Sequence, residues 1–274
     1  MNARRAWRRF ARRADFWGLL VFLVLFFVFM LAPIVVVVVV SFSDASFIAF
    51  PIARVSLRWY RRIWEYRPFM DSLIVSLELA VGSAACAALL GVPAALALTR
   101  SRARFADAVS TFLLAPLSMP MIVLGFSLLY YLSWLGLGVS FASLLLAHTV
   151  VSIPYVARTV AGVYRGIGPD FEEAAAILGA DRWRTFRYVT LPLIRPGIFA
   201  GSLFAILISL DNLPISFFFG SASTNTLPVV MLSYLQNQFD PAIAAISTVQ
   251  MLIAVAALLV VERVYGLAAM SAPS

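Results

Sequence analysis

The chain has 274 residues, of which 62% are hydrophobic and 12% charged, and its formal net charge is +8. Soluble domains are about 45–50% apolar and about 25% charged, so this composition predicts an integral membrane protein. The positive charge consists of arginines that mostly flank apolar segments, whereas a nucleic-acid-binding protein gathers its basic residues on one soluble face. One cysteine and one histidine exclude an intramolecular disulfide and a Cys/His metal site, and we expect no cofactor.

Residues 1–16 form an arginine-rich segment ahead of the first apolar run. Arginine pairs recur every four residues, which places them on one stripe of an amphipathic helix lying on the anionic inner leaflet. Residues 17–41 are too long for a signal-peptide core and are predicted as the first transmembrane helix. Arginines ahead of a span favour a cytoplasmic N-terminus. These arginines are Arg4, Arg5, Arg8, Arg9, Arg12 and Arg13.

Residues 42–70 then form an external segment. They contain five arginines, which conflicts with the preference of basic residues for cytoplasmic loops, but the stronger bias of the N-terminus decides the orientation. The aromatic stretch from Leu57 to Trp64 predicts a helix at the membrane interface.

The remaining segment, 71–263, reads as a core of five further transmembrane helices. The second to fourth spans are predicted at about 72–98, 108–132 and 141–164, with proline kinks in the third at Pro116 and Pro120. A polar cytoplasmic loop occupies 165–195.

Beyond that loop, the fifth span is predicted at 196–219, an external loop with short irregular helix at 220–240, and the sixth span at 241–261. A cytoplasmic tail covers 264–274. The fold class is therefore an all-α polytopic membrane protein with six transmembrane helices and both termini in the cytoplasm.

The polar loop predicts two short helices. Asp170 followed by Glu173 fits a capping box, so the first helix is expected to begin at Phe171. Gly179 permits the left-handed conformation that ends a helix. A second short helix is expected to lead to Pro192, and the pair forms a knob with exposed apolar side chains that favour a partner.

The spacing within this loop carries a family resemblance. The loop contains Glu173-Ala174-Ala175, then three residues and Gly179, then nine residues and Val189, and finally Leu191-Pro192. This spacing resembles the EAA loop of bacterial ABC importer permeases, although the family more often has Ile at the position of Val189. The resemblance implies the permease fold and a coupling role for Glu173, Ala174 and Gly179 against an ATPase. The predicted loop residues are Glu172, Glu173, Ala174, Ala175, Gly179, Ala180, Leu191 and Pro192.

Within that family, the chain is most similar to the second permease of spermidine/putrescine-type importers. Supporting motifs include Ser209-Leu210-Asp211-Asn212 and Thr226-Leu227-Pro228. Relatives that import iron, thiamine, phosphonates or opines share much of the pattern. The resemblance implies a bacterial inner-membrane protein with a second permease (homologue or second copy), two cytoplasmic ATPase subunits and an extracytoplasmic binding protein. The chain has no G-x-x-x-x-G-K-[ST] phosphate loop, so it is not expected to be an enzyme.

Ionisable residues at membrane depth are costly and mark candidate functional sites. Asp211 and Asn212 lie in the predicted fifth span just before Pro214, and a carboxylate beside a loosened helix suits a cation pathway. Pairing of Asp211 with an arginine, or packing against the partner permease, explains it equally well. Glu78 in the second span is the other candidate for the substrate pathway.

Three further residues receive structural interpretations. His148 is expected to be a hydrogen-bonded packing residue, Arg158 to reach toward the cytoplasmic interface and Cys86 to fill space among alanines. Two rival functions remain: an ion-driven secondary transporter, which requires inverted repeats and paired broken helices, and a membrane enzyme, which requires an interfacial cluster of catalytic side chains. Neither pattern is found in the sequence.

Overall fold

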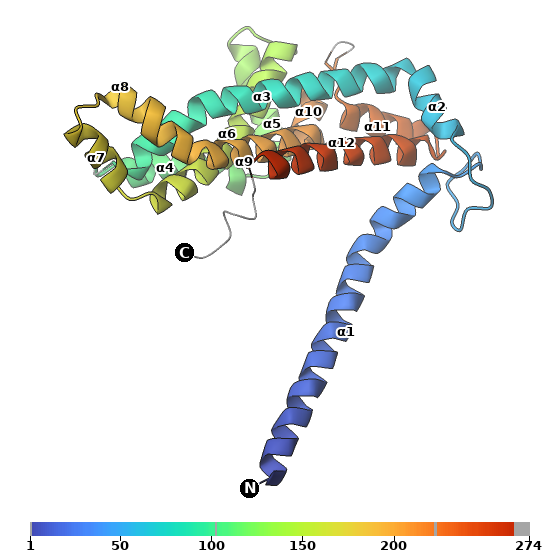
Figure 1. Ribbon diagram of the computed structural model, residues 1–274. Helices are drawn as coiled ribbons and strands as arrows, with labels where there is room; N and C mark the ends of the chain where they lie inside the picture. The colour runs from blue at the N-terminus through green and yellow to red at the C-terminus, as the bar shows by residue number, and fades with distance from the viewer. Residues whose placement is uncertain (1, 102, 222–223, 266–274) are drawn as a thin grey trace. The chain divides into compact units, whose positions relative to one another are not determined.

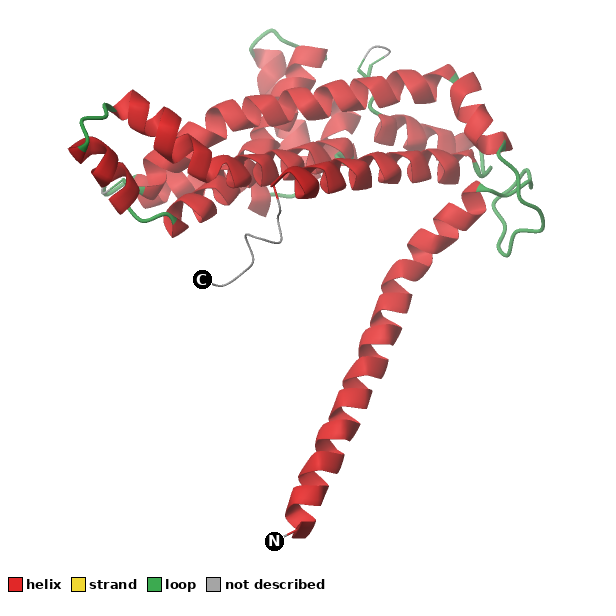
Figure 2. Cartoon of the chain, in the orientation of Figure 1, coloured by secondary structure: helices red, strands yellow, loops and turns green. Residues whose placement is uncertain are grey.

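The computed structural model describes residues 2–101, 103–221 and 224–265, with side chains described for 16–101, 103–221 and 224–263. Within these ranges the chain consists of helices and loops and forms no β-sheet (Figure 2). Five helices are long and apolar enough to cross a membrane, and a sixth crossing results if one bent helix pair counts as a span. The predicted all-α membrane fold is therefore confirmed. The chain divides into two compact units, residues 1–65 with 238–250, and residues 66–237 with 251–274.

The first unit begins with the long helix α1 (Asn2–Ser41). Its apolar part, Phe16–Ser41, includes the run of valines that would favour a strand in water. In lipid a helix satisfies its own backbone hydrogen bonds, which explains why α1 continues through them. The arginine stripe predicted for residues 1–16 lies outside the described side chains.

A helix, α2 (Arg58–Glu65), is present near Trp64, where the sequence predicts one. Trp59 and Ile63 are buried on one face, while the arginines face outward. Arg58 donates a hydrogen bond of 2.9 Å to the carbonyl oxygen of Asp44, and the Tyr60 hydroxyl lies 2.7 Å from Ser41 Oγ. These contacts tie α2 to the end of α1 and the loop between them.

The second unit is built on three packed helices, α3 (Arg67–Thr99), α6 (Phe141–Gly166) and α9 (Leu191–Leu210) (Figure 1). Glycines bring α6 and α9 close together. A Cβ added at Gly201 would lie 2.8 Å from the Cα of Val156, and one added at Gly197 would lie 2.9 Å from Val163 Cγ2. Small residues spaced four apart are the usual means of close helix packing in membranes.

The third predicted span is not one continuous helix. It consists of α4 (Ala106–Leu114), the 3₁₀ turn η1 (Ala115–Ser118) and α5 (Met121–Trp134), and the two halves are bent by 109°. Met119 is extended because the ring of Pro120 disfavours a helical conformation in the residue before it. The kink predicted at the prolines is thus a complete break.

The fifth span also differs from its predicted range, 196–219. It runs without interruption from Arg182 to Leu210, through α8 (Arg182–Thr185), a π-helical turn η2 (Phe186–Thr190) and α9. It ends before Pro214, and two short helices follow, α10 (Leu213–Ser216) and η3 (Phe217–Phe219). The second helix of the polar loop is therefore the start of the span rather than a separate element.

The last two helices complete the chain. The external segment predicted as irregular contains the regular helix α11 (Leu227–Asn237), which packs on α3. Its first amide, that of Leu227, donates a 2.8 Å hydrogen bond to Ser76 Oγ, a buried side chain of α3. The sixth predicted span is present as α12 (Ala242–Tyr265).

Candidate functional site

The polar loop folds into the short helix α7 (Asp170–Ile177) at one end of the α3–α6–α9 bundle (Figure 1). The predicted capping box is wrong: Pro169 is the N-cap residue, and no side chain caps the helix. The amides of Glu172 and Glu173 both donate to the carbonyl oxygen of Pro169 at 3.0 Å. Asp170 is thus the first helical residue, where its charge favours the positive end of the helix dipole.

Gly179 ends α7 as the sequence predicts. Its φ is +84°, and the amides of Gly179 and Ala180 donate to the carbonyl oxygens of Ala176 and Ala175, each at 3.0 Å. This pair of hydrogen bonds is the Schellman motif, which requires a residue in the left-handed region. Asp181 then caps α8 by accepting a 2.8 Å hydrogen bond from the amide of Arg184. The turn between the two helices is therefore fully specified by local interactions.

Glu172 joins α7 to the bundle through three partners, and we call these four residues the Glu172 cluster. Its Oε1 accepts hydrogen bonds from the hydroxyls of Tyr164 (2.9 Å) and Thr190 (2.7 Å). Its Oε2 accepts one of 2.6 Å from Arg100 Nη1. Hydrogen bonds to an ionised carboxylate are about twice as strong as neutral ones. The cluster therefore anchors α7 strongly at one point.

The partners of Glu172 come from three different elements. Arg100 caps the end of α3, Tyr164 lies in the last turns of α6, and Thr190 is buried at the start of α9. The guanidinium of Arg100 also stacks over the Tyr164 ring, with Cζ 4.4 Å from the ring centroid. A displacement of α7 would consequently act on the ends of all three packed helices at once.

The neighbouring loop residues are arranged differently. Glu173 and Ala174 are exposed, whereas Ala175 and Ala180 are partly buried beside the turn. Leu191 and Pro192 are the first residues of α9 and directly follow the π-helical turn η2. The two glutamates of the predicted motif thus have opposite environments: Glu172 is turned to the bundle and Glu173 to the surroundings.

A large apolar surface surrounds this turn. Ile177 and Leu178 are 85% and 88% exposed at the tip of α7. Exposed apolar groups that lie together mark an interaction surface. The other large apolar side chains exposed on residues 165–195 are Phe171, Trp183, Tyr188 and Leu193.

Polar residues in the predicted spans have distinct roles. His148 is buried, with Nδ1 2.8 Å from Ser209 Oγ and Nε2 3.1 Å from Ser216 Oγ, so it is the hydrogen-bonded packing residue that the sequence predicts. Asn212 is also buried, and its Oδ1 accepts a 3.1 Å hydrogen bond from the amide of Ile215 to cap α10. Asp211 closes α9 with its side chain exposed.

Glu78 and Asp211 lie at similar depth. Glu78 precedes Arg100 by 22 residues on α3, and Asp211 follows Thr190 by 21 residues on α9. At about 1.5 Å per residue, each carboxylate lies about 32 Å along its helix from the Glu172 cluster. Both side chains are exposed on packed helices. Within the described part of the chain, no three His, Cys, Asp or Glu side chains gather as metal ligands.

Known proteins identify the family. The family described as binding-protein-dependent transport system inner membrane component matches residues 87–269. The chain belongs to this family. It is thus an inner-membrane permease subunit of an ABC importer and not itself the ATPase, and the alternatives of a secondary transporter and a membrane enzyme are excluded.

Several relatives are similar over most of their length. The molybdenum permease ModB of Mycobacterium tuberculosis is 36% identical over 239 residues, which covers 80% of this chain and 89% of that protein. The putrescine permease PotI of Escherichia coli is 33% identical over 236 residues, 84% of each chain. The spermidine/putrescine permease PotC of Haemophilus influenzae is 31% identical over 235 residues, 86% of this chain and 91% of that protein.

Solved structures share the fold. A permease chain of a bacterial importer of the polysaccharide alginate superposes with a TM-score of 0.71 at 18% identity, over 93% of this chain and 98% of that chain. A chain of the methionine transporter MetNI in an inward-facing conformation gives a TM-score of 0.59 at 20% identity, over 72% and 96%. The predicted permease fold is therefore confirmed.

Sequence reasoning missed the partners of Glu172. In the sequence, Arg100 is one of the many arginines that flank apolar segments, and nothing marks Tyr164 or Thr190. Arg100 and Glu172 are 72 residues apart, so no local pattern links them. The available signal was weak: Tyr164 is the last residue of a predicted span, Arg100 lies two residues beyond the end of another, and Thr190 lies inside the predicted polar loop.

Proposed function

We propose that residues 165–195 form the surface through which this permease couples to a cytoplasmic ATPase subunit. The observation that carries the proposal is the combination of exposed Ile177 and Leu178 with the Glu172 cluster behind them. The apolar tip suits insertion into a cleft of the partner, while the cluster fixes α7 to the ends of α3, α6 and α9. Force applied to α7 is then passed to the spanning helices rather than absorbed by a loose loop.

The same proposal sets the orientation and the assembly. With the polar loop in the cytoplasm, both termini are cytoplasmic and residues 42–70 are external. Two ATPase subunits close on binding ATP, draw the α7 tips of two permease subunits together and open the cavity outward; hydrolysis resets it. The second permease is a homologue or another copy of this chain, and an extracytoplasmic binding protein delivers the substrate. Asp211 faces outward from its own chain, so the path is proposed to run between the two permeases.

We further propose a polyamine or a similar small organic cation as the substrate. Glu78 and Asp211 are carboxylates at matching depth, and carboxylates at membrane depth mark cation pathways. PotI and PotC, relatives named for putrescine and spermidine, support this proposal. Asn212 contributes by capping α10, which holds the break that presents Asp211.

An oxyanion is the second candidate substrate, because the ModB relative is named for molybdenum transport and is 36% identical. A pathway lined by two carboxylates opposes an oxyanion by like-charge repulsion. Iron, thiamine, phosphonates and opines remain further substrates to be tested by competition.

The test is ATP-dependent uptake of labelled spermidine by the complete assembly in proteoliposomes, competed by putrescine, molybdate, ferric iron, thiamine and an aminophosphonate. Competition by putrescine alone, with uptake lowered in Asp211→Asn and Glu78→Gln but unchanged in Glu262→Gln, is the expected result. Molybdate uptake without spermidine uptake would overturn the cation assignment and leave the permease function intact. Unchanged spermidine uptake in Asp211→Asn would make that residue structural.

A further inference from the structure

A cavity of about 270 Å³ lies between the ends of α3, α4 and α6, at the same end of the bundle as α7. This volume lies just below the about 300–1,000 Å³ of typical small-ligand pockets, so the cavity has room for a group of headgroup size and not for a larger ligand. Its walls combine aliphatic side chains of α3 and α4 with hydroxyl, carboxylate and guanidinium groups. The polar lining residues are Thr99, Asp107, Ser110, Arg158 and Arg165.

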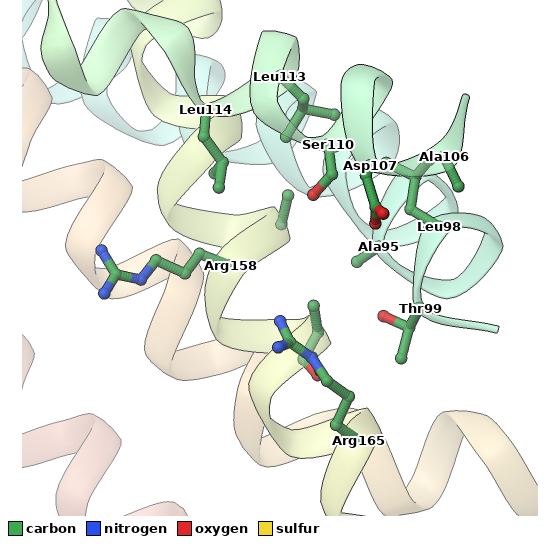
Figure 3. Close-up of a pocket in the computed structure, with 12 residues that line it drawn as sticks. Ala95, Leu98, Thr99, Ala106, Asp107, Ser110, Leu113, Leu114, Arg158 and Arg165 are labelled. Carbon is green, nitrogen blue, oxygen red and sulfur yellow. The ribbon is translucent and has the colours of Figure 1, made fainter. Parts of the chain in front are cut away.

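Opposite charges line the cavity from different walls without pairing. Asp107 lies on α4 and Arg165 on α6, and Figure 3 shows both beside the same space with Thr99 and Ser110. Among the described residues, no arginine forms an ion pair with Asp107 and no donor forms a hydrogen bond with its carboxylate. Within the described part of the chain, the hydrogen bond of the Arg165 side chain runs from Nε to the carbonyl oxygen of Ala161, one turn back on its own helix, at 3.2 Å.

Two further arginines near this end of the bundle do not pair with Asp107. Arg100 is paired with Glu172, and the guanidinium of Arg158 is turned away from Asp107 and Ser110 (Figure 3). An acid and a base that share a cavity but do not contact each other suit an occupant that carries both signs. Arginine recognises phosphate through paired donors, and a carboxylate recognises an ammonium group.

We propose that this cavity binds a phosphoethanolamine group, with the phosphate on Arg165 and the ammonium on Asp107. The hydroxyls of Thr99 and Ser110 donate the remaining hydrogen bonds. Leu98 and Leu113 provide the apolar wall beside which the glycerol backbone of a phospholipid continues toward its acyl chains. The inference rests on the proposed orientation only in assigning the site to the cytoplasmic leaflet, where basic pockets between spanning helices hold headgroups.

The test uses the complete assembly in nanodiscs of equimolar phosphatidylethanolamine and phosphatidylglycerol, with retained lipids counted by native mass spectrometry. Wild type is expected to retain phosphatidylethanolamine preferentially. Asp107→Asn should lower that preference about fivefold, and Arg165→Gln should lower retention of both lipids about fivefold, which corresponds to about 1 kcal/mol per charge. Arg195→Gln, an exposed arginine of α9 that does not line the cavity, is the matched control.

A second arm identifies the source of the group. Soluble phosphoethanolamine is added to assemblies in pure phosphatidylglycerol, and its binding is measured by protection of the α4 amides from hydrogen exchange. Protection in wild type and not in Asp107→Asn supports a free ligand; lipid preference without such protection supports a membrane lipid. An equal lipid ratio in wild type, Asp107→Asn and Arg165→Gln, with no protection, overturns the proposal. Retained ATPase activity in these assemblies keeps that failure separate from failure of the proposed coupling function.

Discussion

Removing the carboxylate of Glu172 should free α7 from the bundle. Glu172→Ala deletes the acceptor of two hydroxyl hydrogen bonds and of the Arg100 ion pair. The side chains of Arg100 and Glu172 are 32% and 22% exposed, so the ion pair itself is worth at most about 1 kcal/mol. The two hydroxyl hydrogen bonds add about 1 kcal/mol each. The expected loss is therefore about 2–3 kcal/mol in the free energy that holds α7 in place.

Hydrogen exchange of the amides in Asp170–Leu178 measures this quantity directly in the assembled transporter. A loss of about 2–3 kcal/mol corresponds to exchange faster by roughly 30- to 150-fold, provided that global opening does not dominate. Uptake per ATP hydrolysed should fall at the same time, because a loosened α7 no longer moves the ends of the spanning helices together.

Glu173→Ala is the matched control, since it removes an adjacent carboxylate of the same helix that is exposed and has no hydrogen bond or ion pair among the described residues. Exchange should stay unchanged in this variant, whereas its affinity for the ATPase subunit should fall if Glu173 contacts the partner. Equal exchange rates in Glu172→Ala and Glu173→Ala would refute the reasoning. The exchange rate in Glu172→Gln should lie between those of wild type and Glu172→Ala, because the amide oxygen of glutamine still accepts hydrogen bonds from the two hydroxyls.

Three further variants test the packing and the turn. Gly179→Ala should destabilise the turn by about 1–2 kcal/mol through the φ of +84° alone, since nothing lies within 4 Å of an added Cβ. Local hydrogen exchange measures this loss. Gly162→Ala, which is also unobstructed but has no positive φ, should not destabilise its helix. Gly201→Ala should lower the free energy of unfolding by about 1–3 kcal/mol, because the added Cβ would lie 2.8 Å from the Val156 Cα. An unchanged thermal unfolding temperature would contradict the close α6–α9 contact. His148→Ala should lower the free energy of unfolding by about 1–2 kcal/mol in the same assay, because it removes two interhelical hydrogen bonds. His148→Phe should not restore the lost stability.

Local features of the chain were determined by sequence alone. Apolar length and the backbone's need for internal hydrogen bonds decide that residues 17–41 are helical despite their valines. Gly179 ends α7 because the left-handed conformation is a property of the residue itself. The spacing around Glu173 likewise indicated the family, and comparison with known proteins confirmed this family over residues 87–269.

The tertiary structure decided everything that joins distant segments. The sequence allowed Asp170 to cap α7 and Pro120 merely to kink a span, whereas the structure has Pro169 as the cap residue and a 109° break. Glu172 received its role from Arg100, 72 residues away, because only the packing of α3, α6 and α9 brings their ends to one point. Backbone preferences act within a few residues, whereas a carboxylate's partners depend on which helix ends meet.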